Sequence, residues 1–224
     1  MIELQSIRVT DFDTNCYLVN RLDTRSCIIV DPGGDIDIVM SKLRSEDLRP
    51  AAILLTHSHL DHAGGVALLK KSAESQYGTT LPLYAHKEDL ELLYSITKQA
   101  SLFGFDSDKF QDSPTPDVLV EDDSDLSITG ITIKVLHTPG HTAGHVCFYF
   151  ANSKPFVLSG DTLFKSSVGR TDLPGGNHNL LIKSIKEKLL VLPDETIVYP
   201  GHGPQTDIYC ERISNPFLQA ASIL

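Results

Sequence analysis

Residues 51–62 of the chain, AAILLTHSHLDH, join a short apolar run to four potential metal ligands within six residues. These four ligands are His57, His59, Asp61 and His62. The run at 51–55 has the length and composition of a buried strand. In an extended segment His57 and His59 leave the backbone on the same side, because successive side chains alternate. The last two ligands follow on what should be the opening turn of the next helix.

Three further candidate ligands come at or just beyond the ends of other apolar runs. They lie in VLHTPGH, FVLSGDTLF and IVYPGH, and they are His141, Asp161 and His202. Imidazole nitrogen and carboxylate oxygen suit Zn²⁺ and related first-row ions. Four ligands from one loop would strain to meet around a single tetrahedral ion, and seven suit two ions that share a bridge. Packing alone gives no reason to place four polar groups after an apolar strand, so we interpret the pattern as a two-metal site.

Strands and helices alternate in both halves of the chain. We expect strands at 2–9, 15–20, 26–31, 51–55, 80–85, 117–120, 126–136, 145–151, 155–159 and 195–199. We expect helices at 35–48, 63–75, 86–103 and 178–190, a loop at 104–116, and a short C-terminal helix or tail. This alternation predicts a layered α/β fold with helices outside two sheets. The length of 224 residues fits a single domain over 1–224.

The composition, with 41% hydrophobic and 21% charged residues, is that of a globular protein. The net charge of −10 argues against a nucleic-acid partner, because phosphate binding needs a basic face. No apolar run reaches 18 residues, so no membrane partner is expected. The first residues lack a secretory pattern, which predicts a cytoplasmic location. Four scattered cysteines predict unpaired, mostly buried thiols, and they are Cys16, Cys27, Cys147 and Cys210.

The remaining histidines divide into two groups. His86, followed by Lys87 at the start of a helix, and His178 in GGNHN are interpreted as surface residues. His137 and His145 flank a candidate ligand, and the sequence leaves open whether they support the site or only pack.

Other catalytic patterns are missing from the sequence. There is no G-x-S-x-G motif, so a serine hydrolase would have no nucleophile. The segment PGGD at 32–35 and the glycine pair at 175–176 do not match a phosphate-binding loop, and turns explain both.

At these residues the chain resembles the metallo-β-lactamase fold superfamily, whose signature is H-x-H-x-D-H followed by a spaced His, Asp and His. All seven positions match, and the similarity extends from TNCYLVN at 14–20 through VDPGG at 30–34 to NPFL at 215–218. Within the superfamily, TPGHTAGH, SGDTLF and GRTDLPGG resemble short glyoxalase II-like hydrolases, which lack a C-terminal helical domain. The resemblance implies a four-layer αββα sandwich with the metals at one edge of the two sheets.

The resemblance also implies how the ligands divide between two divalent ions. One ion would take His57, His59 and His141. The other would take Asp61, His62 and His202, and Asp161 would bridge the two ions. Zinc is the expected metal, and iron and manganese are the alternatives because the same ligand types accept them.

The activity that the resemblance implies is hydrolysis of an acyl thioester, such as a 2-hydroxyacyl-glutathione, by a hydroxide that bridges the two ions. Asp61 would be the catalytic residue, orienting the water or taking its proton. Arg170, in VGRTDLPGG, would bind a substrate carboxylate, and Lys165 is a second candidate for that role. The chain continues for 22 residues after His202, which is room for one helix.

Three other functions compete with this hypothesis. A glutathione persulfide dioxygenase carries a similar motif set and would use a single iron at His57, His141 and Asp161. The segments LPGG after GRTD and PGHGPQT after Tyr199 favour the hydrolase. A β-lactamase proper is disfavoured because no secretory signal is visible. A metal-binding module without turnover is disfavoured because a structural site is normally closed by four ligands. The sequence leaves the oligomeric state open.

Overall fold

The computed structural model describes residues 2–219, which form two compact units, each containing a six-stranded mixed sheet. The first unit holds the chain up to Val120 together with Ser127–Ile131. The second unit holds Glu121–Leu126 and the chain from Thr132 onward.

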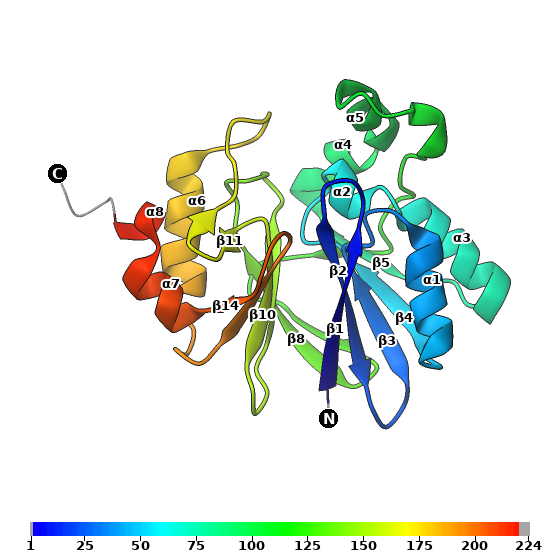
Figure 1. Cartoon of the computed structure of the whole chain (residues 1–224), viewed down its shortest axis with the longest axis horizontal. Helices are drawn as coiled ribbons and strands as arrows, with labels where there is room; N and C mark the ends of the chain where they lie inside the picture. Colours follow the sequence, from blue (N-terminus) through cyan, green and yellow to red (C-terminus); the bar gives the residue numbers. More distant parts are fainter. Residues whose placement is uncertain (1, 220–224) are drawn as a thin grey trace. The chain divides into compact units, whose positions relative to one another are not determined.

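The sheet of the first unit has the strand order β1-β2-β3-β4-β5-β6 (Figure 1). Its strands are β1 (Ile2–Val9), β2 (Thr14–Arg21), β3 (Ser26–Val30), β4 (Arg49–Leu54), β5 (Leu83–His86) and β6 (Val118–Val120). The first three strands pair antiparallel, and β3 to β6 pair parallel. Parallel neighbours need long crossover connections, and helices supply them here. The carboxyl ends of β3, β4 and β5 therefore meet at one edge of the sheet.

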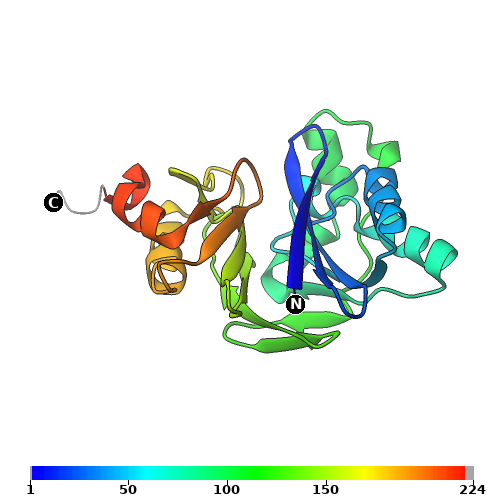
Figure 2. The same cartoon turned by 60° about the horizontal axis from the view of Figure 1, so that its bottom comes forward.

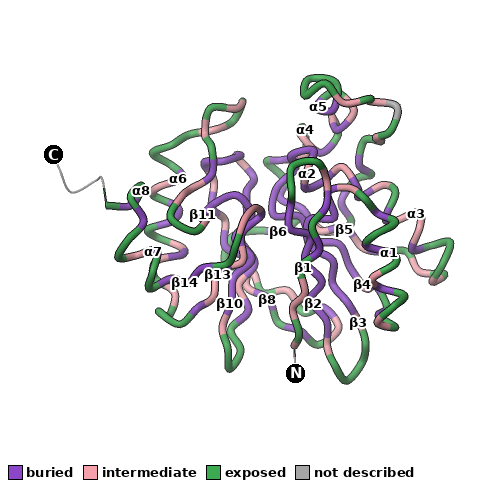
Figure 3. The backbone as a smooth tube through the Cα atoms, in the orientation of Figure 1, coloured by how far each residue is buried: buried purple, intermediate pink, exposed green. Residues whose placement is uncertain are grey.

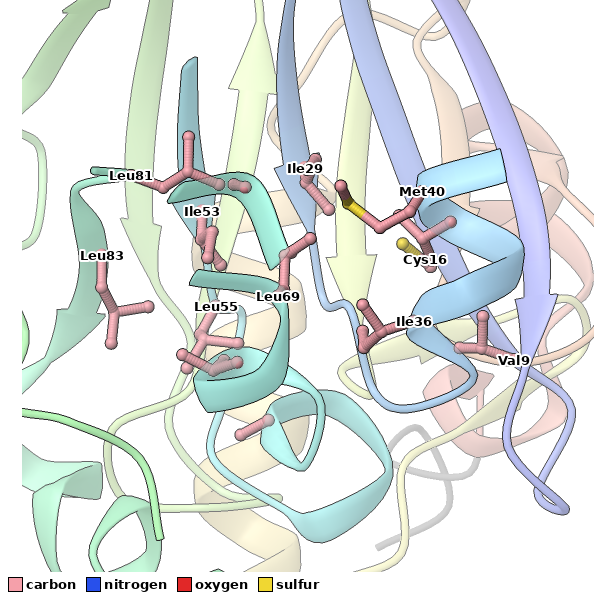
Figure 4. Close-up of a cluster of buried hydrophobic side chains, with 14 of the residues drawn as sticks. Val9, Cys16, Ile29, Ile36, Met40, Ile53, Leu55, Leu69, Leu81 and Leu83 are labelled. Carbon is pink, nitrogen blue, oxygen red and sulfur yellow. The ribbon is translucent and has the colours of Figure 1, made fainter. Parts of the chain in front are cut away.

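The crossovers of the first unit contain five helices among the described residues. They are α1 (Ile36–Ser45), α2 (Leu60–Ala63), α3 (Val66–Tyr77), α4 (Leu90–Leu93) and α5 (Ile96–Leu102), with short 3₁₀ turns at Lys87–Asp89 and Ser107–Lys109. Met40 of α1 and Leu69 of α3 pack with Ile29 and Ile53 from the strands (Figure 4). Figure 3 shows the consequence: the strands are largely buried, whereas the far sides of α1 and α3 are exposed. Each fully buried aliphatic side chain of this kind contributes about 1.5–3 kcal/mol to stability.

The second sheet has the order β14-β13-β10-β9-β8-β7 and belongs to the second unit, except for Ser127–Ile131 in the β7–β8 hairpin. Its strands are β7 (Asp125–Ile128), β8 (Ile131–His137), β9 (Val146–Phe150), β10 (Phe156–Gly160), β13 (Ile197–Pro200) and β14 (Thr206–Asp207). A small hairpin of β11 (Leu163–Phe164) and β12 (Ser167–Val168) follows β10. The β10–β13 pair is parallel, whereas β8–β9, β9–β10 and β13–β14 are antiparallel.

Helices cover one face of this second sheet. They are α6 (His178–Ser184), continued by a π-helical turn at Ile185–Leu189, then α7 (Ile208–Ser214) and α8 (Pro216–Gln219). Figures 1 and 2 both place α6 and α7 on the same side of the sheet. Leu181 and Ile185 pack there against Val157 and Val198 from the central strands. The predicted α/β fold class is confirmed, because mixed sheets flanked by helices form both units. The single domain over 1–224 stays a prediction.

Two predicted elements are wrong in detail. The expected helix at 86–103 is broken at Tyr94 and Ser95, between α4 and α5. The expected strand at 126–136 is a hairpin, because Thr129 and Gly130 take φ angles of 50° and 77° between β7 and β8. Positive φ at two successive residues is the geometry of a tight hairpin turn.

Among the described helices, none is long and apolar enough to cross a membrane. The four cysteines all lie in the described part of the chain, and no disulfide joins any two of them. Cys16, Cys27 and Cys147 are buried and Cys210 is exposed, as expected for mostly buried thiols.

Thiol labelling tests this packing. Burial raises the pKa of the Cys16 and Cys27 thiols, so both thiolate fraction and access are low in the native state. We expect an aromatic disulfide reagent to label one thiol per native chain, that of Cys210, and all four thiols in denaturant. Absorbance of the released thiolate gives the count. Rapid labelling of a second native thiol would contradict the core described here.

Candidate metal centre

The first unit gathers the four candidate ligands of residues 57–62 into one cluster, here called the first ligand set. The chain bends at Thr56, and His59, with extended backbone angles, is the N-cap of α2, which begins at Leu60. The ring of His57 lies 4.8 Å from that of His59 and 4.0 Å from that of His62, centroid to centroid. An Asp61 carboxylate oxygen, Oδ2, lies 3.3 Å from His62 Nε2. The prediction that His57 and His59 project together is confirmed.

The carboxylate of Asp31 holds this loop from the neighbouring strand. Oδ1 accepts the Thr56 backbone N–H at 2.8 Å, and Oδ2 accepts the Thr56 hydroxyl at 2.7 Å and His62 Nδ1 at 3.0 Å. Asp31 directly follows β3, and Thr56 follows β4, so the parallel pairing of these strands brings the two residues together. In the tautomer that donates to this carboxylate, Nδ1 of His62 carries the proton. Its Nε2 is therefore the nitrogen with a lone pair for a metal.

The backbone of the same loop is clamped by side chains that follow β5. Ser58 N–H donates to Asp89 Oδ2 at 3.1 Å, and Leu60 N–H donates to Gln99 Oε1 at 2.9 Å. The amide nitrogen of Gln99 in turn donates to the Ser58 carbonyl at 3.1 Å. Asp89 and Gln99 are both buried, so these bonds are shielded from water. These bonds hold the loop in the conformation that gathers its candidate ligands.

The segment Pro32–Gly34, which follows β3, also contacts the loop that carries the first ligand set. Gly33 N–H donates to the His62 carbonyl at 2.8 Å. Gly33 has φ of 54°, and a Cβ at this position would lie 2.2 Å from the Asp61 carbonyl oxygen. Only glycine permits both the backbone angle and the close approach. The interpretation of this segment as a turn was therefore correct but incomplete.

The carboxylate of Asp61 is fixed from β2. Thr14, fully buried at the start of that strand, donates its hydroxyl to Asp61 Oδ2 at 3.1 Å. The Thr14 hydroxyl also lies 3.1 Å from the Thr10 hydroxyl. Asp61 is thus oriented between a hydroxyl donor on one side and the His62 ring on the other.

The second unit brings His141, Asp161 and His202 together, here called the second ligand set. His141 lies in the turn from β8 to β9, while Asp161 and His202 follow the parallel strands β10 and β13. All three therefore lie at one end of the same sheet. Asp161 Oδ2 is 3.6 Å from His141 Nε2 and 3.6 Å from His202 Nε2. A single carboxylate oxygen between two imidazole nitrogens is the arrangement expected at a metal-binding carboxylate.

Neighbouring groups orient the second ligand set. His141 Nδ1 donates to the Arg170 carbonyl at 2.8 Å, which leaves Nε2 directed at Asp161. Asp161 N–H donates to Nε2 of the buried His145 at 3.0 Å. The question left open for His145 is answered in favour of support, because its ring holds the backbone of Asp161, a candidate ligand. His137 is half-buried and braces the same turn through the Ala143 carbonyl at 2.9 Å.

Arg170 and Lys165 are both exposed. The Arg170 guanidinium forms two 2.8 Å hydrogen bonds to the carboxylate of Asp172, and this contact lowers the pKa of Asp172 to about 2. Gly169 explains part of the G-R-T-D motif, since a Cβ there would lie 1.8 Å from the Asp161 carbonyl oxygen. The motif thus supports the second ligand set through its backbone. The binding of a substrate carboxylate by Arg170 stays a prediction.

One histidine assignment is wrong. His86 was expected at the surface but is buried, because it is the last residue of β5. Its Nδ1 accepts the Glu88 N–H at 3.4 Å and so caps the turn that follows. His178, at the start of α6, is exposed as expected.

The chain belongs to the Metallo-beta-lactamase superfamily, a superfamily of metallo-hydrolases, whose family model matches residues 9–202. The predicted fold and family are both confirmed. The curated relatives include the probable metallo-hydrolase YqgX of Bacillus subtilis, 36% identical over 96% of this chain and 97% of that protein. They also include the hydroxyacylglutathione hydrolase GloC of Haemophilus influenzae, 36% identical over 99% of this chain and 100% of that protein.

Solved structures give the same result. The BLEG-1 B3 metallo-beta-lactamase matches with a TM-score of 0.87 and 37% identity over 97% of this chain and 100% of that chain. TTHA1623, crystallised in a di-iron-bound form, matches with a TM-score of 0.84 and 38% identity over 96% of this chain and 100% of that chain. ETHE1 from Myxococcus xanthus matches with a TM-score of 0.77 and 25% identity over 96% of this chain and 83% of that chain.

The hydrogen bonds of Asp31 generate a prediction for Asp31→Asn. The amide keeps the shape of the side chain but places a donor where the carboxylate accepts, so the His62 ring loses its fixed orientation. Loss of such a partner costs about 10–100-fold in metal affinity. Competition with a chromophoric chelator measures the affinity, with Asp37→Asn on the exposed face of α1 as the control. Equal zinc affinity in both folded variants would contradict the role of Asp31.

Proposed function

We propose that this protein is a metal-dependent hydrolase of acyl thioesters, with a 2-hydroxyacyl-glutathione as the leading substrate. One observation carries the proposal: the second unit holds Asp161 Oδ2 3.6 Å from both His141 Nε2 and His202 Nε2. A carboxylate so shared is the ligand that a two-ion centre needs as its bridge. The full-length similarity to the hydroxyacylglutathione hydrolase GloC supports the choice of thioester.

We further propose that the two ligand sets serve one two-ion centre. One ion would be held by His57, His59 and His141. The other would be held by Asp61, His62 and His202, with Asp161 shared. The donor chemistry fits, because His62 and His141 each use Nδ1 for a hydrogen bond to a protein oxygen and turn Nε2 toward a ligand carboxylate.

Nitrogen and oxygen donors of this kind suit zinc, which is the metal we propose, and they also accept iron or manganese. The di-iron form of the related TTHA1623 makes iron the first alternative. When bound, two such ions would supply hydroxide at neutral pH and neutralise charge that develops on a carbonyl oxygen.

The chain's own residues would contribute orientation and proton transfer. Asp61, fixed by the Thr14 hydroxyl, would align the attacking water and accept its proton. A thiolate leaves readily, so the proposed reaction demands no strong general acid. Arg170 would release Asp172 and bind a substrate carboxylate in its place. Asp172 is an exposed partner, so breaking this ion pair costs little.

A second function is favoured by the likeness to ETHE1. In this alternative the chain is a glutathione persulfide dioxygenase with a single iron at His57, His141 and Asp161. The likeness to the BLEG-1 β-lactamase adds β-lactam hydrolysis as a third activity to assay. For location we propose the cytoplasm, because four cysteines without a disulfide are typical of a reducing compartment.

Hydrolysis of S-lactoylglutathione by the metal-loaded protein tests the proposed reaction. We expect chelation to abolish turnover and zinc to restore it. Asp161→Ala should lose both bound metal and at least about a thousandfold in kcat/KM, the loss expected when a unit of the catalytic centre is removed. His178→Ala, an exposed histidine at the start of α6, is the control and should retain full rate.

Two results would contradict the hydrolase proposal. One is turnover by metal-free protein or by Asp161→Ala at the wild-type rate. The other is oxygen uptake with glutathione persulfide in place of thioester hydrolysis, which would establish the dioxygenase.

A further inference from the structure

The first unit contains a cavity of about 360 Å³ whose lining residues, Asp61 apart, have no part in the proposed metal chemistry. It lies between the β1–β2 loop, the start of α1, the segment from α2 to α3, and the segment at 105–111. Most of its wall is apolar, and the large apolar side chains in it are Phe12, Ile36, Leu60, Leu68, Phe105 and Phe110. An apolar cavity of about 150 Å³ already admits benzene. The volume here therefore suffices for a phenyl ring and the carbons that attach it.

The aromatic side chains of this cavity form a continuous wall. The rings of Phe12 and Phe105 lie 5.5 Å apart, and those of Phe105 and Phe110 lie 6.2 Å apart, centroid to centroid. Phe12 is 40% exposed although it is large and apolar. Aromatic pairs at these separations prefer tilted or edge-to-face contacts. An aromatic ring of a ligand can pack against this wall in the same way.

The cavity adjoins the first ligand set. Asp61 and its neighbour Leu60 are lining residues of the cavity, and Asp61 belongs to the first ligand set. Thr10, another lining residue, lies within hydrogen-bond distance of Thr14, and Thr14 donates to Asp61. A substrate whose carbonyl reaches Asp61 can therefore extend an attached group into the cavity.

The charges around the cavity select which part of a thioester enters it. Among the described lining residues outside the ligand set, Asp11, Asp35 and Asp106 carry carboxylates and Lys109 carries an ammonium. This excess of negative charge disfavours the carboxylate groups of a thiol carrier such as glutathione. A neutral apolar acyl group meets no such penalty and gains about 25 cal/mol for each square ångström of apolar surface removed from water.

We propose that this cavity binds the acyl group of the substrate and makes the enzyme prefer thioesters of aryl-substituted acids. The proposal rests on the proposed thioester hydrolysis. Phe12 acts as a specificity determinant through direct contact with the acyl group, and a larger side chain at Ala67, a lining residue on α3, would take up part of the cavity.

Binding without metal tests the cavity independently of the reaction. The probes are phenylacetamide and acetamide, two neutral carbonyl compounds that differ by one phenyl ring, added to chelator-treated, isotope-labelled protein. We expect phenylacetamide to shift the backbone amide signals of Phe12, Leu68 and Phe110, and acetamide to leave them unchanged. Ala67→Phe should abolish the shifts. Equal response to both probes, or no response to either, would overturn the proposal.

Kinetics with two matched substrates test specificity. The ratio of kcat/KM for S-phenylacetylglutathione to that for S-acetylglutathione should exceed about tenfold in the wild-type protein. Phe12→Ala should lower this ratio about three- to tenfold, the value of one aromatic contact. Phe217→Ala removes a phenyl group of similar exposure, 45%, from α8 in the second unit and should leave the ratio unchanged.

The two arms separate the two proposals. Phenylacetamide binding without hydrolysis of either thioester would support the cavity and overturn the proposed function. Hydrolysis of both thioesters at equal efficiency, unchanged by Phe12→Ala and Ala67→Phe, would overturn the acyl-group assignment and leave the proposed function standing.

Discussion

The buried carboxylate of Asp31 is the group on which the geometry of the first ligand set depends. It accepts hydrogen bonds from the Thr56 backbone, the Thr56 hydroxyl and the ring of His62, all within 3.0 Å. A buried carboxylate is costly unless its oxygens are satisfied, and removing one partner of such a group costs several kcal/mol. The three bonds satisfy the oxygens of Asp31. They also fix where β4 ends and which nitrogen of His62 faces Asp61. The parallel pairing of β3 with β4 is what makes this contact available.

The two units use the same means to prepare their ligands. Each gathers candidate ligands at an end of its sheet, and each directs Nδ1 of a histidine to a protein oxygen so that Nε2 faces a carboxylate. Glycines at 33 and 169 allow the supporting backbone to approach Asp61 and Asp161 more closely than any side chain would permit. Hydrogen bonds within the fold therefore orient the candidate ligands, and such preorganisation reduces the cost of binding a metal. This orientation is the physical basis of the proposed two-ion centre.

The sequence indicates the candidate ligands more readily than the residues that support them. Core packing gives no reason to place His57, His59 and Asp61 directly after an apolar run, so their spacing indicates metal binding. The alternation of strands and helices leads to the α/β class. Spacing cannot reveal Asp89 or Gln99, because these residues reach the loop only through tertiary contacts. The segment that begins at His86 resembles an exposed helix start, yet β5 carries His86 into the interior.

Local chemistry accounts for the remaining differences between the predictions and the structure. Thr129 and Gly130 turn one apparent strand into a hairpin. In the sequence, a single glycine within an alternating run is the only sign of this turn. Asp31 could have been found in VDPGG, since a carboxylate at the end of a buried strand needs partners. The cavity beside Asp61 is built from segments far apart in the sequence, so no local pattern indicates it.

The number of metal ions bound per chain tests the central claim most directly. Protein purified without added metal and then dialysed against zinc should contain about two ions per chain by elemental analysis, since seven ligands suit two ions that share a bridge. Its rate of S-lactoylglutathione hydrolysis should rise in proportion to the second equivalent of zinc that it binds. A limit of one ion per chain, iron retained through purification and full activity at that occupancy would contradict the two-ion centre.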